Sequence, residues 1–266
     1  MRLLVSGCAG NMGRQVTALC RRGYHGMQAI CGVDQRVGEG EGVPCVRSFD
    51  EIWQTVDGVV DFSHPDNTEP MLRFCLDRRI PAVIATTGHT DPQRERIRQA
   101  AESIPVFFAA NFSCGTVLLC RLAREVARAL PQAQIEIIEY HRAGKADAPS
   151  GTARLLVQEL SRERPGAVSQ YGRHGQHARR PEEIGIHSVR LGNTVATHEV
   201  LFGNGSETLS LRHEVIDRAL FAEGALLALE FVADRPPGLY GMEDLLASEP
   251  PDGDGRTKIH RKEDLS

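Results

Sequence analysis

The first half of the chain alternates short apolar runs with segments of helical periodicity. The apolar runs have the length of buried strands and lie at residues 2–6, 27–33, 58–62, 82–86 and 106–110. The segments between them predict helices at about 12–22, 67–78 and 92–102, with a shorter helix at 49–54. Strands that alternate with helices are typical of a parallel sheet built from right-handed crossovers. The pattern therefore predicts an α/β domain.

The second half follows a different pattern. It predicts helices at 117–129 and 150–163, a polar loop at 164–182, and strands at 135–140, 186–191, 194–202 and 207–214. Gly192-Asn193 and Gly203-Asn204-Gly205 separate the last three strands as hairpin turns would. We predict an α+β domain with a mostly antiparallel sheet, one face packed on helices and the other available for an oligomer. A last helix at 218–232 is expected to return to the first domain.

Composition and charge narrow the class of protein. The 266 residues are 41% apolar and 25% charged, and the formal net charge is −4. A chain with no basic excess has no bulk attraction for nucleic acid, so we expect no nucleic-acid partner. No apolar run reaches the roughly 18 residues that a membrane span needs. The seven cysteines form no Cys-x-x-Cys pair, which favours reduced thiols in a cytoplasmic protein.

A glycine-rich loop follows the first apolar run. Gly7, Gly10 and Gly13 are spaced as Gly-x-x-Gly-x-x-Gly where a strand leads into a helix. A phosphate needs close backbone approach and N–H groups at the positive end of a helix, and such a loop offers both. Asp34 ends the second run, 21 residues after Gly13, where a carboxylate accepts hydrogen bonds from ribose hydroxyls. The pattern predicts a dinucleotide site; the alternative is a turn that only packs the helix on the strand.

The charges near the end of the second run bear on the choice of dinucleotide. A carboxylate repels a 2′-phosphate, so Asp34 favours NADH. Arg36 could reach a 2′-phosphate, or it could be a solvated surface charge. We expect NADH, NADPH or both as cofactors, with NADH at least accepted.

Two further segments follow predicted parallel strands. Ala85-Thr86-Thr87-Gly88 ends the fourth strand, and Ala109-Ala110-Asn111-Phe112 ends the fifth. Ligands of open parallel sheets bind beyond the carboxyl ends of the strands. Both segments are therefore expected to border the nicotinamide half of the cofactor, although Thr86 and Thr87 could instead cap a helix.

The segment from Glu139 to Thr152 is the richest in chemistry. A predicted strand ends near His141, a loop carries Lys145, and Ser150 can cap the helix that follows. The N–H groups at the start of that helix, with the cations around them, suit a carboxylate or dicarboxylate. A lysine there can both pair with a carboxylate and donate a proton. The alternative is a capped helix with basic residues on its surface.

The remaining histidines point to no metal site. His174 and His177 lie in the polar loop without acidic or cysteine ligands nearby, so we expect them to be solvated. His187, His198 and His213 fall on three successive predicted strands. One sheet face could gather these three, but packed or hydrogen-bonded side chains are the better interpretation.

Taken in order, these segments closely resemble the dihydrodipicolinate reductase family, over residues 1 to about 247. The most specific segment is Lys145-Ala146-Asp147-Ala148-Pro149-Ser150-Gly151-Thr152-Ala153. Other resembling segments are Gly7–Arg14, Asp61–Pro65, Thr86–Gly88, Ala110–Ser113, Ile184–Arg190, Arg218–Ala225 and Gly238–Met242.

The resemblance implies both an activity and an architecture. The activity is NAD(P)H-dependent reduction of (2S,4S)-4-hydroxy-tetrahydrodipicolinate, a small dicarboxylate, in lysine and diaminopimelate biosynthesis. The architecture is a Rossmann-type domain, a central substrate domain and a homotetramer in which the central sheets associate. We place the dinucleotide-binding domain at 1–112 and 219–248, the substrate and tetramerisation domain at 113–218, and a polar tail at 249–266.

The resemblance also assigns residues. His141 matches the family's proton donor or acceptor, Lys145 its proton donor, and Gly151 and Thr152 its seat for a substrate carboxylate. The residues that match its cofactor contacts are Gly7, Cys8, Ala9, Gly10, Asn11, Met12, Asp34, Ala85, Thr86, Thr87, Ala109, Ala110, Asn111 and Phe112.

The chain departs from the family pattern at three places, one of them a dipeptide. Arg142 stands where a second histidine is usual, and we expect its guanidinium to hold a substrate carboxylate. Ala85 replaces a glycine, and Ala196-Thr197 replaces Gly-Glu. Two alternatives stay open: a related reductase of another small carboxylate or imine, and a sensor that binds NAD(P)(H) without catalysis.

Overall fold

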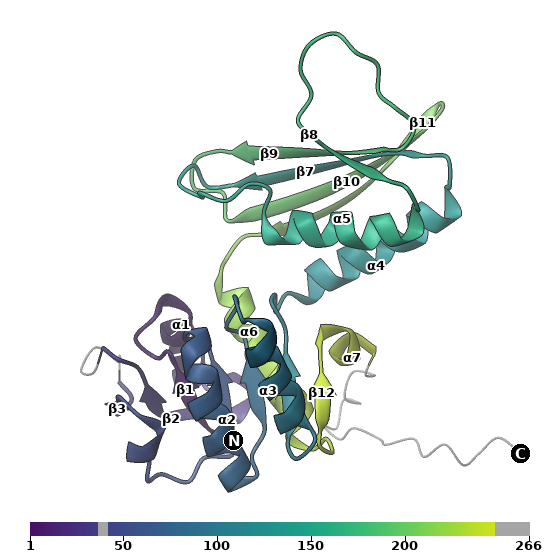
Figure 1. Ribbon diagram of the computed structural model, residues 1–266. Helices are drawn as coiled ribbons and strands as arrows, with labels where there is room; N and C mark the ends of the chain where they lie inside the picture. The colour runs from purple at the N-terminus through teal and green to yellow at the C-terminus, as the bar shows by residue number, and fades with distance from the viewer. Residues whose placement is uncertain (37–41, 248–266) are drawn as a thin grey trace, which may run out of the picture.

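A computed structural model describes residues 1–36 and 42–247. Two layered α/β units, each built on its own sheet, are joined by helix α4 (Cys114–Ala129) and by the chain that leads into helix α6 (Ala219–Ala233) (Figure 1). The predicted tail at 249–266 lies outside the described residues. No helix within these ranges is long and apolar enough to cross a bilayer.

The first sheet has seven parallel strands in the order β12-β6-β5-β4-β1-β2-β3. Chain order reverses beside β1, as in dinucleotide-binding folds, whose ligands bind at the carboxyl ends of the strands beside such a reversal. The parallel sheet predicted from the alternation is confirmed. The strands are β1 Arg2–Ser6, β2 Gln28–Val33, β3 Cys45–Val46, β4 Gly58–Asp61, β5 Ala82–Ile84, β6 Pro105–Phe108 and β12 Gly238–Tyr240.

Helices cover both faces of this sheet. On one face α1 (Asn11–Arg21) and α6 pack over Leu3 and Val5; on the other, α2 (Thr68–Arg78) and α3 (Asp91–Ala101) enclose Leu4. Because both faces are buried, the strands are apolar at nearly every position, and this explains the continuous apolar runs. The remaining helical elements are η1 Tyr24–Gly26, η2 Phe49–Glu51, η3 Pro65–Asn67 and α7 Met242–Ala247.

The second sheet is mixed, with the order β11-β10-β7-β9-β8, and its antiparallel ladders are together longer than its parallel ones. Helices α4 and α5 (Gly151–Glu163) lie side by side over one face (Figure 1). Ile135 and Ile137 point into that layer, and the residues that alternate with them are only partly buried. The strands are β7 Gln134–His141, β8 Val168–Tyr171, β9 Glu183–Arg190, β10 Ala196–Asn204 and β11 Glu207–Val215.

Several predictions about local structure were wrong. Strands β9 and β10 do not form a hairpin across Gly192-Asn193, because β7 lies between them and pairs with both. The predicted loop at 164–182 contains β8, a short, partly exposed edge strand without an apolar signal. The helix expected at 49–54 is a single turn at Phe49–Glu51, which the Ser48 capping box begins. The pattern did not reveal β3, β12 or α7.

Candidate active site

The glycine loop joins β1 to α1 and leaves no room for side chains. Gly7 has a φ of +79°, and a Cβ there would lie 2.5 Å from the carbonyl oxygen of Phe62. A Cβ on Gly13 would collide with the carbonyl oxygen of Gly7. Gly10 is the N-cap residue of helix α1; no side chain caps the helix there, and its first turn holds no acidic residue. Its N-terminal amides are therefore well placed to bind an anion.

The side chains of Cys8 and Ala9 face the interior, with exposed fractions of 1% and 3%. These residues can contact a ligand only through their backbone. Asp34, at the end of β2, accepts a hydrogen bond from the Ala9 amide at 3.1 Å. Arg36 contacts the same carboxylate, with Nε 3.4 Å from Oδ1. The two residues that bear on the choice between NADH and NADPH thus lie together beside the loop.

A hollow of about 350 Å³ lies beyond the ends of β4 and β5. Under it, the buried carboxylate of Asp61 accepts hydrogen bonds from Ser63 Oγ at 2.5 Å and Thr86 Oγ1 at 2.6 Å. Burial raises the pKa of Asp61. This carboxylate fixes the two segments that form the hollow. The lining residues are Phe62, Ser63, His64, Pro65, Ala85, Thr86, Thr87 and Gly88.

The segment after β6 connects the two halves of the molecule. Asn111 Nδ2 donates to Thr152 Oγ1 at 3.3 Å, which brings the end of β6 to the start of α5. Phe112 is buried, with its ring beside Phe62 and its carbonyl covered by Gly224. Its side chain is therefore a packing group in this structure rather than a surface open to a ligand.

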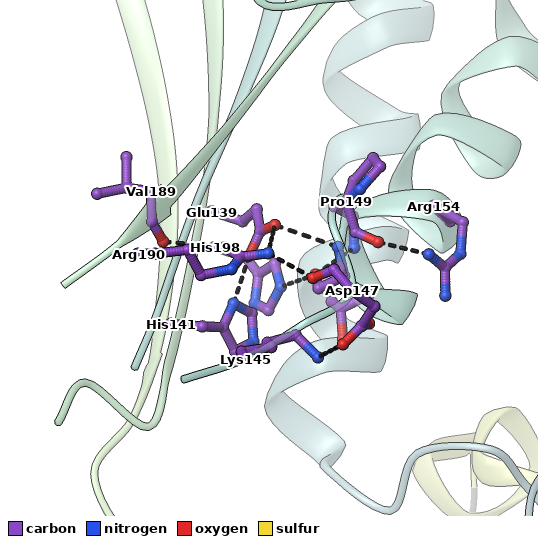
Figure 2. Close-up of polar contacts among 12 residues, drawn as sticks. Glu139, His141, Lys145, Asp147, Pro149, Arg154, Val189, Arg190 and His198 are labelled. Carbon is purple, nitrogen blue, oxygen red and sulfur yellow. Dashed lines mark hydrogen bonds and ion pairs between the residues drawn. The ribbon is translucent and has the colours of Figure 1, made fainter. Parts of the chain in front are cut away.

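The loop at 142–150, here called the lysine loop, leads from β7 to α5. Lys145 Nζ pairs with Asp147 Oδ1 at 2.6 Å, and the lysine side chain is 23% exposed (Figure 2). Ser150 caps α5, since its Oγ accepts from the Ala153 amide at 3.2 Å. The guanidinium of Arg142 is exposed and has no ion-pair partner among residues 1–36 and 42–247.

A buried polar cluster lies beneath this loop (Figure 2). The Glu139 side chain is fully buried and contacts His141 Nδ1 through Oε2. Its other oxygen accepts from Arg190 Nη2 at 2.9 Å. Burial lowers the pKa of His141, and the adjacent Glu139 only partly offsets this effect. The His141 ring is therefore neutral at pH 7.

His198, on β10, completes the cluster. Its ring meets that of His141 edge-on, with centroids 5.3 Å apart, and its Nε2 lies 2.9 Å from Ser150 Oγ. Burial lowers the pKa of His198 to about 4, so this ring is also neutral.

Comparison with known proteins agrees with both halves of this architecture. The family model for the N-terminus of dihydrodipicolinate reductase matches residues 1–112, and the model for its C-terminus matches residues 115–246. The chain belongs to the dihydrodipicolinate reductase family.

Individual relatives of the family cover nearly the whole chain. The 4-hydroxy-tetrahydrodipicolinate reductase of Alkaliphilus oremlandii is 40% identical over 248 residues, which are 92% of this chain and 98% of the relative. That of Clostridium novyi is 35% identical over 250 residues, 93% and 99% of the two chains. A dipicolinate-bound dihydrodipicolinate reductase from Paenisporosarcina sp. TG-14 superposes with a TM-score of 0.76 at 28% identity, covering 92% and 98%.

Within this reductase architecture, three polar residues of the cluster were not identified as site residues from the sequence. Glu139 could have been found, because it lies two positions before His141 and so shares its sheet face. Arg190 gave no local signal, since it lies 51 positions from the glutamate that it contacts. His198 was interpreted as a packed histidine; it is buried, and it also adjoins His141.

The other histidines follow the sequence interpretation. His174 and His177 are exposed, as expected for solvated side chains. His187 forms a hydrogen bond with Glu136 at 2.8 Å on the partly buried face of the sheet. His213 is the cross-strand partner of His198. The three strand histidines therefore do not gather on a single face.

Proposed function

We propose that the chain reduces (2S,4S)-4-hydroxy-tetrahydrodipicolinate to tetrahydrodipicolinate with NADH or NADPH, in lysine and diaminopimelate biosynthesis. The observation that carries this proposal is the contact between Asn111 and Thr152. In a chain of this family, it joins the strand ends of a dinucleotide-type domain to a cationic loop that opens a helix.

The glycine loop fits a dinucleotide pyrophosphate. Backbone atoms fill the space that a Cβ would occupy at Gly7 and Gly13, so no side chain at these positions separates a ligand from the loop backbone. The helical amides that follow have no side-chain cap. We assign to Asp34 the hydrogen bonds to a ribose and to Arg36 the contact with a 2′-phosphate, because the two side chains lie together beside the loop. When bound, the nicotinamide supplies a hydride. The backbones of Ala85–Thr87 and Ala109–Phe112 are the groups proposed to orient it.

The start of α5 suits one carboxylate of the substrate. The amides of Gly151 and Thr152 lie in the first turn of a helix of 13 residues, where the macrodipole favours an anion. Lys145 can exchange its exposed partner Asp147 for a substrate carboxylate, since an exposed ion pair is worth only about 0–1 kcal/mol. Arg142, with its guanidinium in solvent, is a candidate for the second carboxylate.

The reaction needs both a hydride and a proton. Water leaves the hydroxylated ring, and the conjugated imine that results takes up one hydride at carbon and one proton at the far end of the conjugated system. We propose that Lys145, or a water that it positions, donates this proton. We assign to His141, beside it, the role of a proton donor or acceptor. Lys145 also offsets the charge of a dianion close to the dinucleotide.

The proposed assembly is a homotetramer in the cytoplasm. The face of the second sheet opposite α4 and α5 is only partly buried, which supports association through that face. The seven cysteines are free thiols, and we propose that they remain reduced in the cytoplasm. Light scattering on the purified chain measures the assembly: a mass of four chains supports the proposal, and a monomer contradicts it.

A coupled assay tests the activity. The purified synthase that forms 4-hydroxy-tetrahydrodipicolinate generates the substrate in the cuvette. The fall in absorbance of NADH or NADPH then reports its reduction. We expect rapid oxidation of at least NADH by the purified chain and none without the synthase. Oxidation with a different cyclic imine or small carboxylate alone would favour a related reductase. Nucleotide binding without turnover of any of these compounds would favour a sensor.

A further inference from the structure

A fully buried carboxylate stands directly behind the proposed acid–base histidine. Glu139 and His141 are two residues apart on β7, so their side chains leave the same face of the strand. Glu139 is 0% exposed and His141 is 8% exposed. A charged group is rarely buried to this extent unless its partners are fixed, so the partners of Glu139 are informative.

Both oxygens of Glu139 have a directed partner. Arg190 Nη2, from β9, donates to Oε1 at 2.9 Å, and the amide of Ser150 donates to the same oxygen at 3.1 Å. The second oxygen, Oε2, contacts His141 Nδ1. Burial raises the pKa of Glu139, but hydrogen bonds from Arg190 and Ser188 outweigh it, and the net pKa lies below the ordinary value. Glu139 is therefore ionised at pH 7.

An ionised carboxylate accepts hydrogen bonds and donates none. The contact with Oε2 therefore requires a proton on Nδ1 of His141, which leaves Nε2 as the unprotonated nitrogen of the neutral ring. Nε2 has no hydrogen-bond partner within the described ranges, and the His141 side chain retains 11% exposure. The ring presents this nitrogen toward the lysine loop (Figure 2).

We propose that Glu139, clamped by Arg190 and the Ser150 amide, is a positioning residue that holds His141 in the Nδ1–H tautomer with Nε2 directed to the substrate. This inference rests on the proposed function only for the identity of the substrate. Arg190 extends the same clamp to the lysine loop, because its Nη2 also donates to the carbonyl of Asp147 at 2.6 Å. A single guanidinium thus couples the orientation of His141 to the position of the loop that carries Lys145.

A metal ion is the competing interpretation of the same residues. Glu139, His141 and His198 offer three ligand atoms that lie within 4.8 Å of one another. The Arg190 guanidinium, however, is 2.9 Å from the carboxylate and disfavours a second cation there. In addition, His198 Nε2 is already engaged with Ser150 Oγ at 2.9 Å. The hydrogen-bonded arrangement therefore accounts for these residues without an ion.

The charged groups around His141 determine how its pKa responds to a change at Glu139. Burial lowers the pKa of His141, and the cations Lys145 and Arg190 lower it further, while Glu139 is the group that raises it. His198, on β10, is a second titratable neighbour, and burial keeps it neutral. Removal of the Glu139 charge therefore moves the titration of His141 to lower pH.

The first test uses the wild-type chain alone. Nitrogen-15 NMR of labelled histidines distinguishes the two neutral tautomers, and the His141→Gln variant assigns the signal. We expect His141 to be neutral at pH 7, with the proton on Nδ1. A wild-type ring protonated on Nε2 overturns the proposal, whether or not any Glu139 variant folds.

The second test compares Glu139→Gln with Glu139→Asp in the coupled assay. Glutamine keeps the size but can donate to Nδ1 through its amide and select the other tautomer. We expect kcat to fall about 100-fold or more, with a much smaller change in KM, since acid–base assistance is worth about 10²–10⁴-fold. In the pH–rate profile, the limb that reports the titration of His141 moves to lower pH. Aspartate retains the charge and restores part of kcat.

Glu230→Gln is the matched control, because Glu230 also contacts a histidine Nδ1, that of His25, at 2.7 Å, but on the surface of the other domain. This variant should retain full activity. Unchanged kcat and an unmoved pH limb in Glu139→Gln contradict the inference. If wild-type chain does not reduce the substrate, the proposed function fails instead, while the tautomer measurement still decides the role of Glu139.

Discussion

The glycine loop and the lysine loop both lead from a strand into a helix, yet they place different groups around the start of that helix. At the glycine loop, side chains are absent or turned inward, and the surface proposed to face the ligand is backbone. At the lysine loop, the helix is capped by Ser150 and bordered by charged side chains that a buried carboxylate organises. The first site depends on empty space and the second on a network of charges.

This contrast determines which changes each site tolerates. A glycine loop fails when an atom is added, because packed backbone has nowhere to move. A charged network fails when an atom is removed, because the remaining charge loses its partner. Substitutions at the two loops should therefore separate nucleotide binding from chemistry.

The largest expected effect is that of Lys145→Ala. Loss of the proposed proton donor and carboxylate partner should lower kcat/KM about 10²–10⁴-fold in the coupled assay. The affinity for NADH, measured by fluorescence titration, should change less than about twofold, because the glycine loop is in the other domain. Arg162→Ala, which removes a cation near the far end of α5, serves as the control and should stay active. Wild-type turnover in Lys145→Ala would contradict the role of the lysine.

Gly7→Ala tests the opposite loop. The added Cβ would lie 2.5 Å from the Phe62 carbonyl oxygen, so the loop must shift, and we expect NADH affinity to fall about 100-fold or more. Gly23→Ala is a matched control: Gly23 has a φ of +77°, close to the +79° of Gly7, but no atom lies within 4 Å of its Cβ position. It should lose only about 1–2 kcal/mol of stability from backbone strain. Equal losses of affinity in both variants would show that the close approach is unimportant.

Asp34→Ala should change the preference between the two dinucleotides. Loss of the proposed ribose acceptor is expected to weaken NADH binding about tenfold, the size of a hydrogen bond to a charged group. NADPH should be affected less, because the charge that repels its 2′-phosphate is also removed. Titrations with both nucleotides measure the ratio. An equal loss for NADH and NADPH would indicate that Asp34 only holds the Ala9 amide.

The smallest effect is a pH dependence of stability that arises at His198. Burial lowers its pKa to about 4, whereas a histidine in the unfolded chain has its ordinary pKa of about 6.5, so the unfolded chain binds the proton more readily between these values. Stability is therefore lost as pH falls through about 6.5 toward 4. In urea denaturation, wild type should lose about 1 kcal/mol more than His198→Gln between about pH 7 and pH 5.5. Identical pH dependence in the two chains would contradict burial of a neutral ring.

The sequence was most informative where structure is set by local sterics. Gly7, Gly13 and Asp34 could be assigned to one nucleotide-type loop because a strand, a tight turn and a helix fix their spacing. The alternation of apolar runs likewise predicted the parallel sheet, since burial on both faces leaves a continuous apolar pattern.

Features that depend on distant partners could not be predicted. The turn at Gly192-Asn193 suggested a hairpin, but β9 and β10 each pair with β7, and local turn chemistry does not specify the strand inserted between them. Glu139 has an ordinary strand position, and its role depends on Arg190, which lies 51 residues later. The sequence can therefore place Glu139 on the sheet face of His141, but its contact with Arg190 is visible only in three dimensions.

We propose that the glycine loop binds the dinucleotide and the lysine loop binds the dicarboxylate. Calorimetry on Lys145→Ala separates the two affinities. NADH is titrated first, and pyridine-2,6-dicarboxylate, the ligand of the solved relative, is titrated into the NADH-bound chain. We expect the affinity for NADH to stay within about twofold of wild type and the affinity for the dicarboxylate to fall about tenfold or more, the loss expected for one charged partner. Undiminished dicarboxylate binding together with weakened NADH binding would contradict this proposal.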